Sequence, residues 1–302
     1  MQPHVFAVWC AACLLWSSAF LFLRIGVTDI PPLTFASLRL ALALSVLLPL
    51  ALARRWLTHL SRREWALIVS TGLLILGVNY ALLFWGAQFI PSGLVAILQS
   101  TTLPVALGLG WLLGSEDVTP RKLASFVISI VGVFVIFSDE AAMPRGRAML
   151  ASAAVFLGAC SLVVGYVCLK TYGKHLHAGT VITIQTSAAA VPLAIAALLI
   201  EGGPAVARWS PAAITALVYL GIVASVIAFG LNYWLLKRID ASLMLLMGVA
   251  EVPIAVALGV IVLSEPLHTR ALVGAACVAL GVALVATPPA GHAQIAKPCR
   301  DS

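Results

Sequence analysis

Charged residues are scarce in this sequence: Asp, Glu, Lys and Arg make up 10% of its 302 residues, 62% are hydrophobic, and the mean hydropathy is +1.08. This composition lies outside the range of soluble domains and is typical of a chain that crosses a membrane several times. Apolar segments of about 20 residues leave only short connections between them, so no separate soluble domain fits. Any chemistry must therefore take place among the helices or in their short loops.

Catalytic groups are also missing from the apolar segments. All six histidines fall outside them, and the segments contain neither a carboxylate pair nor a metal-ligand cluster. An intramembrane protease or acyltransferase needs a nucleophile and a base at one depth, so a membrane enzyme is a weaker hypothesis than a transporter. A structural or sensory membrane protein is a third hypothesis that no feature demands. The sequence has no Walker A pattern, so this chain is not expected to hydrolyse ATP, and no cofactor or metal is expected.

The first apolar run has no positively charged segment before it and no small-residue cleavage site in the right place after it. We therefore expect a retained helix rather than a signal peptide. Five of the six cysteines fall inside apolar segments. Cys10 and Cys13 have redox or metal spacing, but a lipid-embedded helix without a second pair favours small packing residues. The net charge of +7 is scattered beside apolar segments, which argues against a nucleic-acid partner.

Ten apolar segments are long enough to form membrane helices. We predict an all-α membrane protein with helices at residues 5–24, 33–53, 64–86, 91–113, 120–137, 148–169, 179–200, 211–236, 241–263 and 270–287. With the N-terminus inside, twelve Lys and Arg residues lie on the inner side, five lie on the outer side, and Arg39 lies within a span. This asymmetry predicts that both termini are cytoplasmic, in a bacterial-type inner (plasma) membrane. The polar tail at 288–302 is expected to be disordered.

An internal repeat relates the two halves of the chain. Residues 72–137 align without a gap with 221–286 at an offset of 149, with 15 identities in 66 positions. Matched Pro, Trp, Glu, Arg and Gly residues at one offset are hard to obtain by chance. The chain is therefore predicted to be a duplicated five-helix unit, with repeats at 1–143 and 144–287. Because five is odd, the second copy is inverted, as in many secondary transporters with a midplane site between repeats.

One acidic residue, Glu251, lies in the middle of an apolar run, whereas the other ten lie in loops, tails or helix ends. A lone carboxylate in hydrocarbon is costly unless it faces an interior cavity or a partner. Glu251 is therefore the strongest candidate for handling a substrate or a proton, and the alternative is a protonated side chain that only packs helices. Arg39 either extends outward to the interface or reaches into the cavity, at a height that allows Glu251 as its partner.

Other polar and aromatic residues in the predicted helices are candidates for lining a central cavity, although amides there also serve as hydrogen bonds between helices. Counting at about 1.5 Å per residue places Trp16 and Thr102 near mid-depth, with Glu251. Pro104 and Pro253 remove backbone hydrogen bonds at matched places, which indicates either hinges or a shared family shape. The predicted residues for substrate binding or coupling are Glu251, Trp16, Asn79, Tyr80, Gln99, Thr102, Asn232, Trp234 and Arg39.

Several motifs together point to a known family. They are Trp16-Ser17-Ser18-Ala19-Phe20, the stretch from Pro31-Pro32-Leu33-Thr34-Phe35 to Arg39, the two mid-helix prolines, Glu251-Val252-Pro253, and the Ser-Glu turns at Ser115-Glu116 and Ser264-Glu265. In this set of motifs the chain resembles the drug/metabolite transporter superfamily, in particular its EamA-type exporters. The resemblance implies a basket of ten helices around a central cavity, lined mainly by helices one, three, four, six, eight and nine. Glu116 and Glu265, at the membrane edge, are expected to cap turns and form ion pairs.

A secondary or facilitative transporter that works by alternating access is thus the leading hypothesis. A cavity for sugar phosphates should hold several Lys or Arg residues, and only Arg39 lies inside a predicted helix. Amino acids and related zwitterions therefore fit best, and proton-coupled efflux of hydrophobic or cationic drugs is the alternative. The expected partners are a small-molecule substrate, the lipid bilayer and, if Glu251 titrates, protons.

Overall fold

The computed structural model describes residues 3–56, 60–112, 119–137, 146–173, 175–202, 209–236, 238–239, 241–265 and 269–286. Within these ranges the chain forms helices and turns and no strand. The elements of the first half are α1 (Pro3–Gly26), α2 (Pro32–Ala53), α3 (Arg62–Gly72), the π-helical segment η1 (Leu73–Val78), α4 (Asn79–Gly86), α5 (Ser92–Ser100), α6 (Thr102–Leu112) and α7 (Pro120–Phe137). Those of the second half are α8 (Arg147–Tyr172), α9 (Ala178–Glu201), α10 (Pro211–Val218), the π-helical segment η3 (Tyr219–Ile227), α11 (Ala228–Leu236), α12 (Ala241–Leu263) and α13 (Thr269–Ala286). The turn predicted at 115–116 and the tail predicted at 288–302 lie outside the described residues.

Each predicted membrane segment coincides with one helix or with a run of consecutive helices. The runs are α3 with η1 and α4, α5 with α6, and α10 with η3 and α11. Among the described residues, seven helices are long and apolar enough to cross a membrane: Pro3–Gly26, Pro32–Ala53, Arg62–Gly86, Ser92–Leu112, Arg147–Tyr172, Ala178–Glu201 and Pro211–Asn232. The predicted all-α class is confirmed, and the protein is an integral membrane protein.

Turn chemistry predicts correctly where several helices begin. α2 begins at Pro32, where a missing amide costs no helical hydrogen bond. The side chain of Ser210 accepts a hydrogen bond from the amide of Ala213 at 3.2 Å and so caps α10. Thr119 caps α7 in the same way, accepting from the amide of Lys122 at 3.3 Å.

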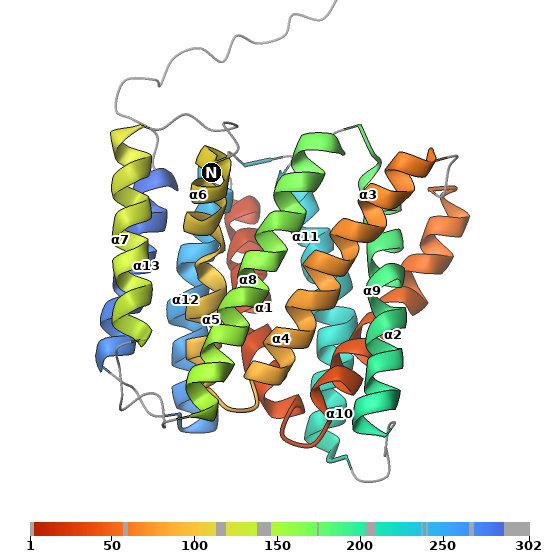
Figure 1. Cartoon of the computed structure of the whole chain (residues 1–302), viewed down its shortest axis with the longest axis horizontal. Coiled ribbons are helices and arrows are strands. Elements are labelled where there is room, and N and C mark those ends of the chain that lie inside the picture. The colour runs from red at the N-terminus through yellow and green to blue at the C-terminus, as the bar shows by residue number, and fades with distance from the viewer. Residues whose placement is uncertain are drawn as a thin grey trace, which may run out of the picture.

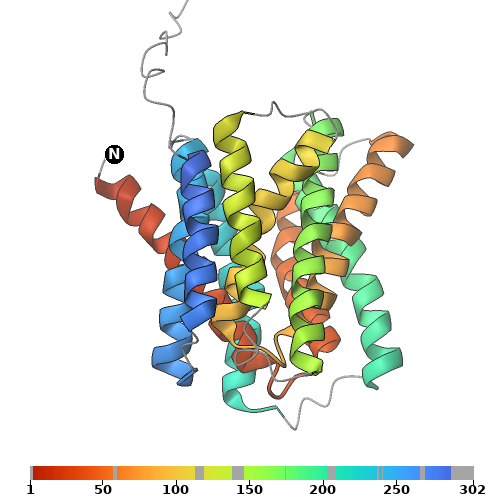
Figure 2. The ribbon, with the colours of Figure 1, turned by 60° about the vertical axis from the view of Figure 1, so that its left-hand side comes forward.

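Helices of the two halves pair across the bundle. α2 packs against α9 at one edge and α7 packs against α13 at the opposite edge (Figure 1). α7 and α13 remain side by side in the turned view (Figure 2). Between these edges, α1 contacts α12 and the run from α10 to α11, while α8 contacts the run from α3 to α4 and the run of α5 and α6. The interior is therefore built from elements of both halves.

A π-helical segment occurs at a matched place in each half. Adding 149 to the bounds of η1, 73 and 78, gives 222 and 227, which fall within η3. A glycine stands at the start of each segment, where helices come very close. A Cβ atom on Gly72 would lie 2.7 Å from Cα of Gln185, and one on Gly221 would lie 2.7 Å from Cβ of Leu42. π-helical turns inside α-helices occur frequently at functional sites.

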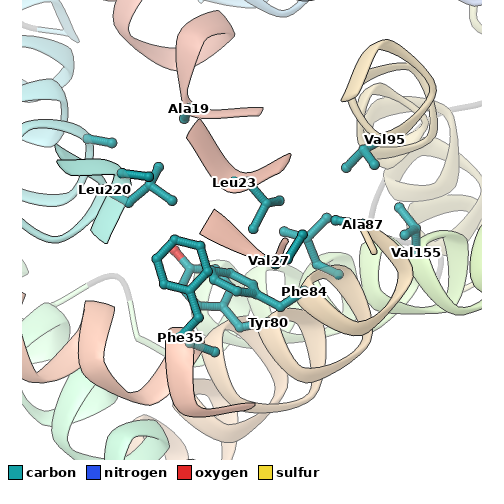
Figure 3. Packing of buried hydrophobic residues seen from close by; sticks show 14 of the residues in the cluster. Ala19, Leu23, Val27, Phe35, Tyr80, Phe84, Ala87, Val95, Val155 and Leu220 are labelled. Atoms are coloured by element: carbon teal, nitrogen blue, oxygen red, sulfur yellow. The ribbon is translucent and has the colours of Figure 1, made fainter. Parts of the chain in front are cut away.

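The largest hydrophobic core lies toward the end of the bundle where α1 ends and α2 begins, which the charge pattern predicts to be the outer end. Its aromatic centre consists of Phe35, Tyr80 and Phe84, with ring centroids 5.2 Å apart for Phe35 and Phe84 and 5.5 Å apart for Tyr80 and Phe84 (Figure 3). A smaller cluster joins α1, α11 and α12 toward the other end. Several predicted site residues belong to these cores: Tyr80 lies in the larger one, and Trp16 and Trp234 pack against the smaller one.

Two carboxylates at the predicted outer end cap helices that are distant in the sequence. Glu201, the last residue of α9, accepts hydrogen bonds from the amides of Leu33 and Thr34, both at 2.8 Å. Glu265 accepts one from the amide of Ser92 at 2.8 Å. A carboxylate at a helix N-terminus satisfies free amides and interacts well with the helix dipole. The capping role predicted for Glu265 is therefore confirmed, although the helix that it caps is α5.

Candidate functional site

The structure divides the predicted site residues between two parts of the bundle. The first, which we call the Arg39 group, lies on α2, α4 and α5 and consists of Arg39, Asn79, Tyr80 and Gln99. The second, the Glu251 group, lies on α1, α11 and α12 and consists of Trp16, Asn232, Trp234 and Glu251. Thr102 stands at the first position of α6 and, at the repeat offset of 149, is the counterpart of Glu251. Each group joins helices that are separated in the sequence.

Arg39 points into the bundle and is only 5% exposed. Its Nε donates a hydrogen bond to Ser225 Oγ of η3 at 3.2 Å. Its guanidinium carbon lies 4.8 Å from the ring centroid of Tyr80 and 6.0 Å from that of Phe84. Both contacts are within the range of cation–π interactions. From the sequence, Arg39 could extend outward to the membrane interface or point into the bundle. In the structure it points into the bundle.

No described carboxylate lies within ion-pair distance of Arg39, and Glu251 is therefore not its partner. The nearest groups to its charge are a hydroxyl and two aromatic rings. A buried cation normally requires an opposite charge or a full set of hydrogen bonds. Among the described residues, the surroundings of Arg39 supply neither.

Asn79 and Gln99 form one hydrogen-bonded pair. Nε2 of Gln99 donates to Oδ1 of Asn79 at 3.2 Å, which joins α4 to α5. Asn79 is 2% exposed, and a Cβ atom on Gly158 would lie 3.0 Å from its Oδ1, so α8 packs directly on the pair. The pair thus serves as a hydrogen bond between helices, the alternative noted for amides in these segments. Its contact with a substrate stays a prediction.

Glu251 lies on the interior face of α12. Met247, four residues earlier, is 3% exposed, and Ala255, four residues later, is 1% exposed. Residues four apart share one face of a helix, so the side chain of Glu251 leaves α12 on its buried side. Glu251 itself is partly exposed and forms no hydrogen bond with a described residue.

Aromatic residues surround the helix of Glu251. Trp16 of α1 and Trp234 of α11 both pack against the small cluster that contains Cys13 and Met247. The ring of Trp234 also lies 4.0 Å from the guanidinium carbon of Arg238, at the end of the bundle predicted to be inner. Both tryptophans thus lie beside α12.

Asn232 of α11 carries an unsatisfied acceptor. Its Oδ1 is buried and accepts no hydrogen bond from a described residue. Buried acceptors without a partner are uncommon in folded proteins. Asn232 is therefore suited to accept a hydrogen bond from a ligand in the interior, which stays a prediction.

The two matched prolines affect their helices differently. α5 ends at Ser100 and α6 begins at Thr102, so the helix is interrupted one turn before Pro104, whose ring nitrogen cannot donate to the carbonyl of Ser100. α12 continues through Pro253 without a break. Pro253 instead lines an apolar groove of about 580 Å³ between α12 and α13. The hinge role predicted for both prolines stays a prediction, but only Pro104 interrupts a helix.

Two residues that complete the surroundings of Arg39 were not predicted from the sequence. Ser225 supplies the hydrogen-bond acceptor and Phe84 the second ring. Ser225 could have been predicted from the sequence, because a hydroxyl stands there in the middle of an apolar segment. Phe84 could not, because aromatic residues are common in such segments. Their proximity to Arg39 depends on how three helices are rotated relative to one another.

The fold and these groups together define a class of protein. The chain is a membrane-embedded bundle of two related halves, with isolated polar groups in its interior. Among the described residues, no three His, Cys, Asp or Glu side chains are grouped so that they could hold a metal ion. Repeated halves that enclose polar groups within a membrane are typical of secondary transporters.

Comparison with known proteins gives the family. The model of the EamA-like transporter family matches residues 5–138 and again 149–287. The chain belongs to this family, which confirms the resemblance to the drug/metabolite transporter superfamily. The two matches agree with a two-repeat architecture.

Similar proteins support the same assignment. An uncharacterized transporter of Bacillus subtilis, YoaV, is 26% identical over 272 residues, which cover 89% of this chain and 92% of the relative. A probable amino-acid metabolite efflux pump of Salmonella typhimurium is 25% identical over 279 residues, 88% of this chain and 89% of the relative. A solved crystal structure shares the fold with a TM-score of 0.64 and 18% identity, over 94% of this chain and 97% of its own. The protein is thus a membrane transporter.

Proposed function

We propose that this transporter exports small zwitterionic metabolites, amino acids above all, across the inner (plasma) membrane. Ten membrane helices in two inverted halves of five enclose a central site that opens alternately to the two sides, with protons as the coupling ion. Family membership supports transport as the activity. A relative named as an amino-acid metabolite efflux pump, 25% identical to this chain, supports this class of cargo.

The inverted arrangement is supported by contacts that repeat with the halves exchanged. α1 contacts the helix run that contains η3, and α8, its counterpart, contacts the run that contains η1. α2 contacts η3, and α9 contacts η1. Such an exchange is the pattern expected when a two-fold axis relates the halves, and five helices in each half would place that axis in the membrane plane.

The observation that carries the proposal is the position of Glu251. It is the one described carboxylate in the middle of a helix and on an interior face, and it forms no hydrogen bond or ion pair with a described residue. The other described acidic residues lie in turns or helix ends, at Asp29, Glu64, Glu201 and Glu265. An ionisable group at that depth is a functional site by default, because a purely structural one is too costly.

An efflux screen tests the proposed cargo. Cells that lack related exporters are loaded with labelled amino acids, and we expect expression of this protein to speed the loss of one or more of them at least about tenfold over the empty vector. The Glu251→Ala variant is the control for leakage. Equal loss from both cells for every amino acid tested would contradict the proposal.

A second cargo class is favoured by Trp16 and Trp234, which pack against the cluster that contains Met247 of α12. Aromatic rings in the part of the bundle that holds a carboxylate suit hydrophobic cations, because ring faces attract positive charge. The same screen distinguishes the two classes when it includes hydrophobic ammonium compounds. Faster loss of these compounds without faster loss of amino acids would favour drug efflux.

The proposed topology predicts where reporter proteins function. A reporter fused after Arg55 or at Arg300 is expected to be cytoplasmic, and one placed between Met143 and Arg147 is expected to lie outside. Alkaline phosphatase is active only outside and green fluorescent protein is fluorescent only inside, so the two reporters give opposite signals at each position. Phosphatase activity at Arg300 would contradict the inverted repeat, because it would place the two termini on opposite sides.

A further inference from the structure

We propose that Arg39 binds the carboxylate of the cargo, so that this transporter accepts α-amino acids and discriminates against their neutral carboxamides. The inference rests on the proposed function and adds which end of the cargo is held, and by which side chain. It starts from the state of the Arg39 guanidinium, a cation that is 5% exposed and has no described carboxylate beside it.

The free hydrogen-bonding capacity of Arg39 matches a carboxylate. A guanidinium has five N–H donors, and only Nε of Arg39 is engaged, by Ser225 Oγ at 3.2 Å. The two terminal nitrogens form no hydrogen bond with a described residue. Terminal guanidinium nitrogens bind carboxylate groups in a planar, two-pronged geometry. Tyr80, 4.8 Å below the charge, supports the plane of the guanidinium by its ring face.

Ser225 fixes the direction of the guanidinium. Its hydroxyl donates to the carbonyl oxygen of Leu220 at 2.8 Å, five residues earlier in the π-helical segment η3. Because that proton is committed to the backbone, a lone pair of Ser225 Oγ is left to accept from Nε of Arg39. The π-helical turn therefore binds Arg39 through Nε alone, and the two terminal nitrogens remain available to a ligand.

The second half of the chain has an uncharged donor at the same place in its second helix. Arg39 is the eighth residue of α2, and Gln185 is the eighth residue of α9. Gln185 is also buried, and its Nε2 donates to Thr71 Oγ1 at 2.9 Å, beside η1. Thr71 Oγ1 in turn donates to the carbonyl oxygen of Leu67 at 2.7 Å. A neutral amide thus makes a buried hydrogen bond between helices at this place in α9, which shows that such a bond does not by itself call for the charge that Arg39 carries.

A single guanidinium also defines the class of anion. A phosphoryl group carries up to two charges and several acceptor oxygens, and its sites gather more than one cation. Of the basic residues, Arg39 alone falls within an interior helix segment in the sequence pattern. One planar fork with one positive charge is complementary to one carboxylate.

Binding to the purified wild-type protein tests the inference directly. The probes are L-threonine, L-cysteine, L-phenylalanine and L-lysine, each compared with its own carboxamide, which keeps the amine and the side chain but has no negative charge. We expect at least one amino acid to raise the unfolding temperature in detergent, and its carboxamide to bind about 10- to 100-fold more weakly. Equal stabilisation by both compounds, or none by any amino acid, would overturn the inference whichever variants fold.

Arg39→Gln is the matched variant, since it copies Gln185, the eighth residue of α9. It is expected to fold, to lose the preference for carboxylate over carboxamide, and to raise KM for the amino acid about 10- to 100-fold in proteoliposomes. Thr71→Val is the control, because it removes a buried hydrogen bond to the eighth residue of α9 and should keep the preference intact. An unchanged preference in Arg39→Gln would overturn the inference.

The two proposals fail in different ways. A wild-type protein that transports an amino acid and its carboxamide with equal KM would contradict the role of Arg39 and leave amino-acid export standing. A wild-type protein that binds amino acids through Arg39 but does not transport them would contradict the proposed function and support the carboxylate site.

Discussion

Replacing Glu251 by Gln is expected to abolish proton-driven transport while leaving exchange of cargo intact. The amide keeps the shape and the hydrogen-bonding capacity of the side chain but cannot gain or lose a proton. Accumulation driven by a proton gradient in inverted vesicles should fall at least about tenfold, to the level of empty vesicles, if every transport cycle passes a proton through this carboxyl. Counterflow in proteoliposomes needs no net proton movement and should continue near the wild-type rate.

The site supports this separation of driven transport from exchange. Glu251 faces the interior between Met247 and Ala255, yet forms no hydrogen bond with a described residue. A carboxyl that is free of fixed partners can change its protonation state as the surrounding helices move. A carboxyl that water reaches from the two sides in turn can take up a proton on one side and release it on the other.

Glu265→Gln is the matched control for Glu251→Gln. Glu265 follows the same helix but caps α5 at the predicted outer end, so its substitution should lower stability without uncoupling transport. Loss of both driven uptake and counterflow in Glu251→Gln would instead mean that the carboxylate binds a cargo amine. Wild-type behaviour in both assays would leave Glu251 as a packing residue only.

The sequence predicts the helices well because their signal is local. Apolar runs set the spans, and residues such as Pro32, Thr119 and Ser210 mark helix starts through interactions within one turn. The orientation of Glu251 toward the interior also follows from one helix alone, since its lipid-facing alternative is too costly.

Three features depend on packing between helices and could not be predicted from local sequence: the π-helical segments, the break before Pro104 and the inward position of Arg39. The π-helical segments have apolar sequences with no distinctive period, and they occur where Gly72 and Gly221 bring backbones together. Pro104 interrupts its helix while its counterpart Pro253 does not, although both stand in similar sequence. The inward position of Arg39 required the rotation of α2 against η3 and α4, which no single-helix pattern contains.

A stability prediction follows from the contact between α7 and α13. A Cβ atom on Gly132 would lie 2.7 Å from the carbonyl oxygen of Gly274, and one on Gly281 would lie 2.8 Å from that of Ser125. Ser125 Oγ also donates to the carbonyl oxygen of Gly281 at 2.6 Å. Lipid is as apolar as the helix surfaces, so close backbone packing and such hydrogen bonds hold membrane helices together.

Leucine at Gly132 or Gly281 is therefore expected to destabilise the protein by about 3 kcal/mol, because the two backbones can separate only if the whole contact opens. The effect is measured by thermal unfolding in detergent and by the yield of monodisperse protein. Gly230→Leu is the control, since a Cβ atom there meets nothing within 4 Å and leucine favours a helix. If Gly132→Leu and Gly230→Leu were equally stable, the α7–α13 contact would not hold the bundle together, and the matched glycines would need another explanation.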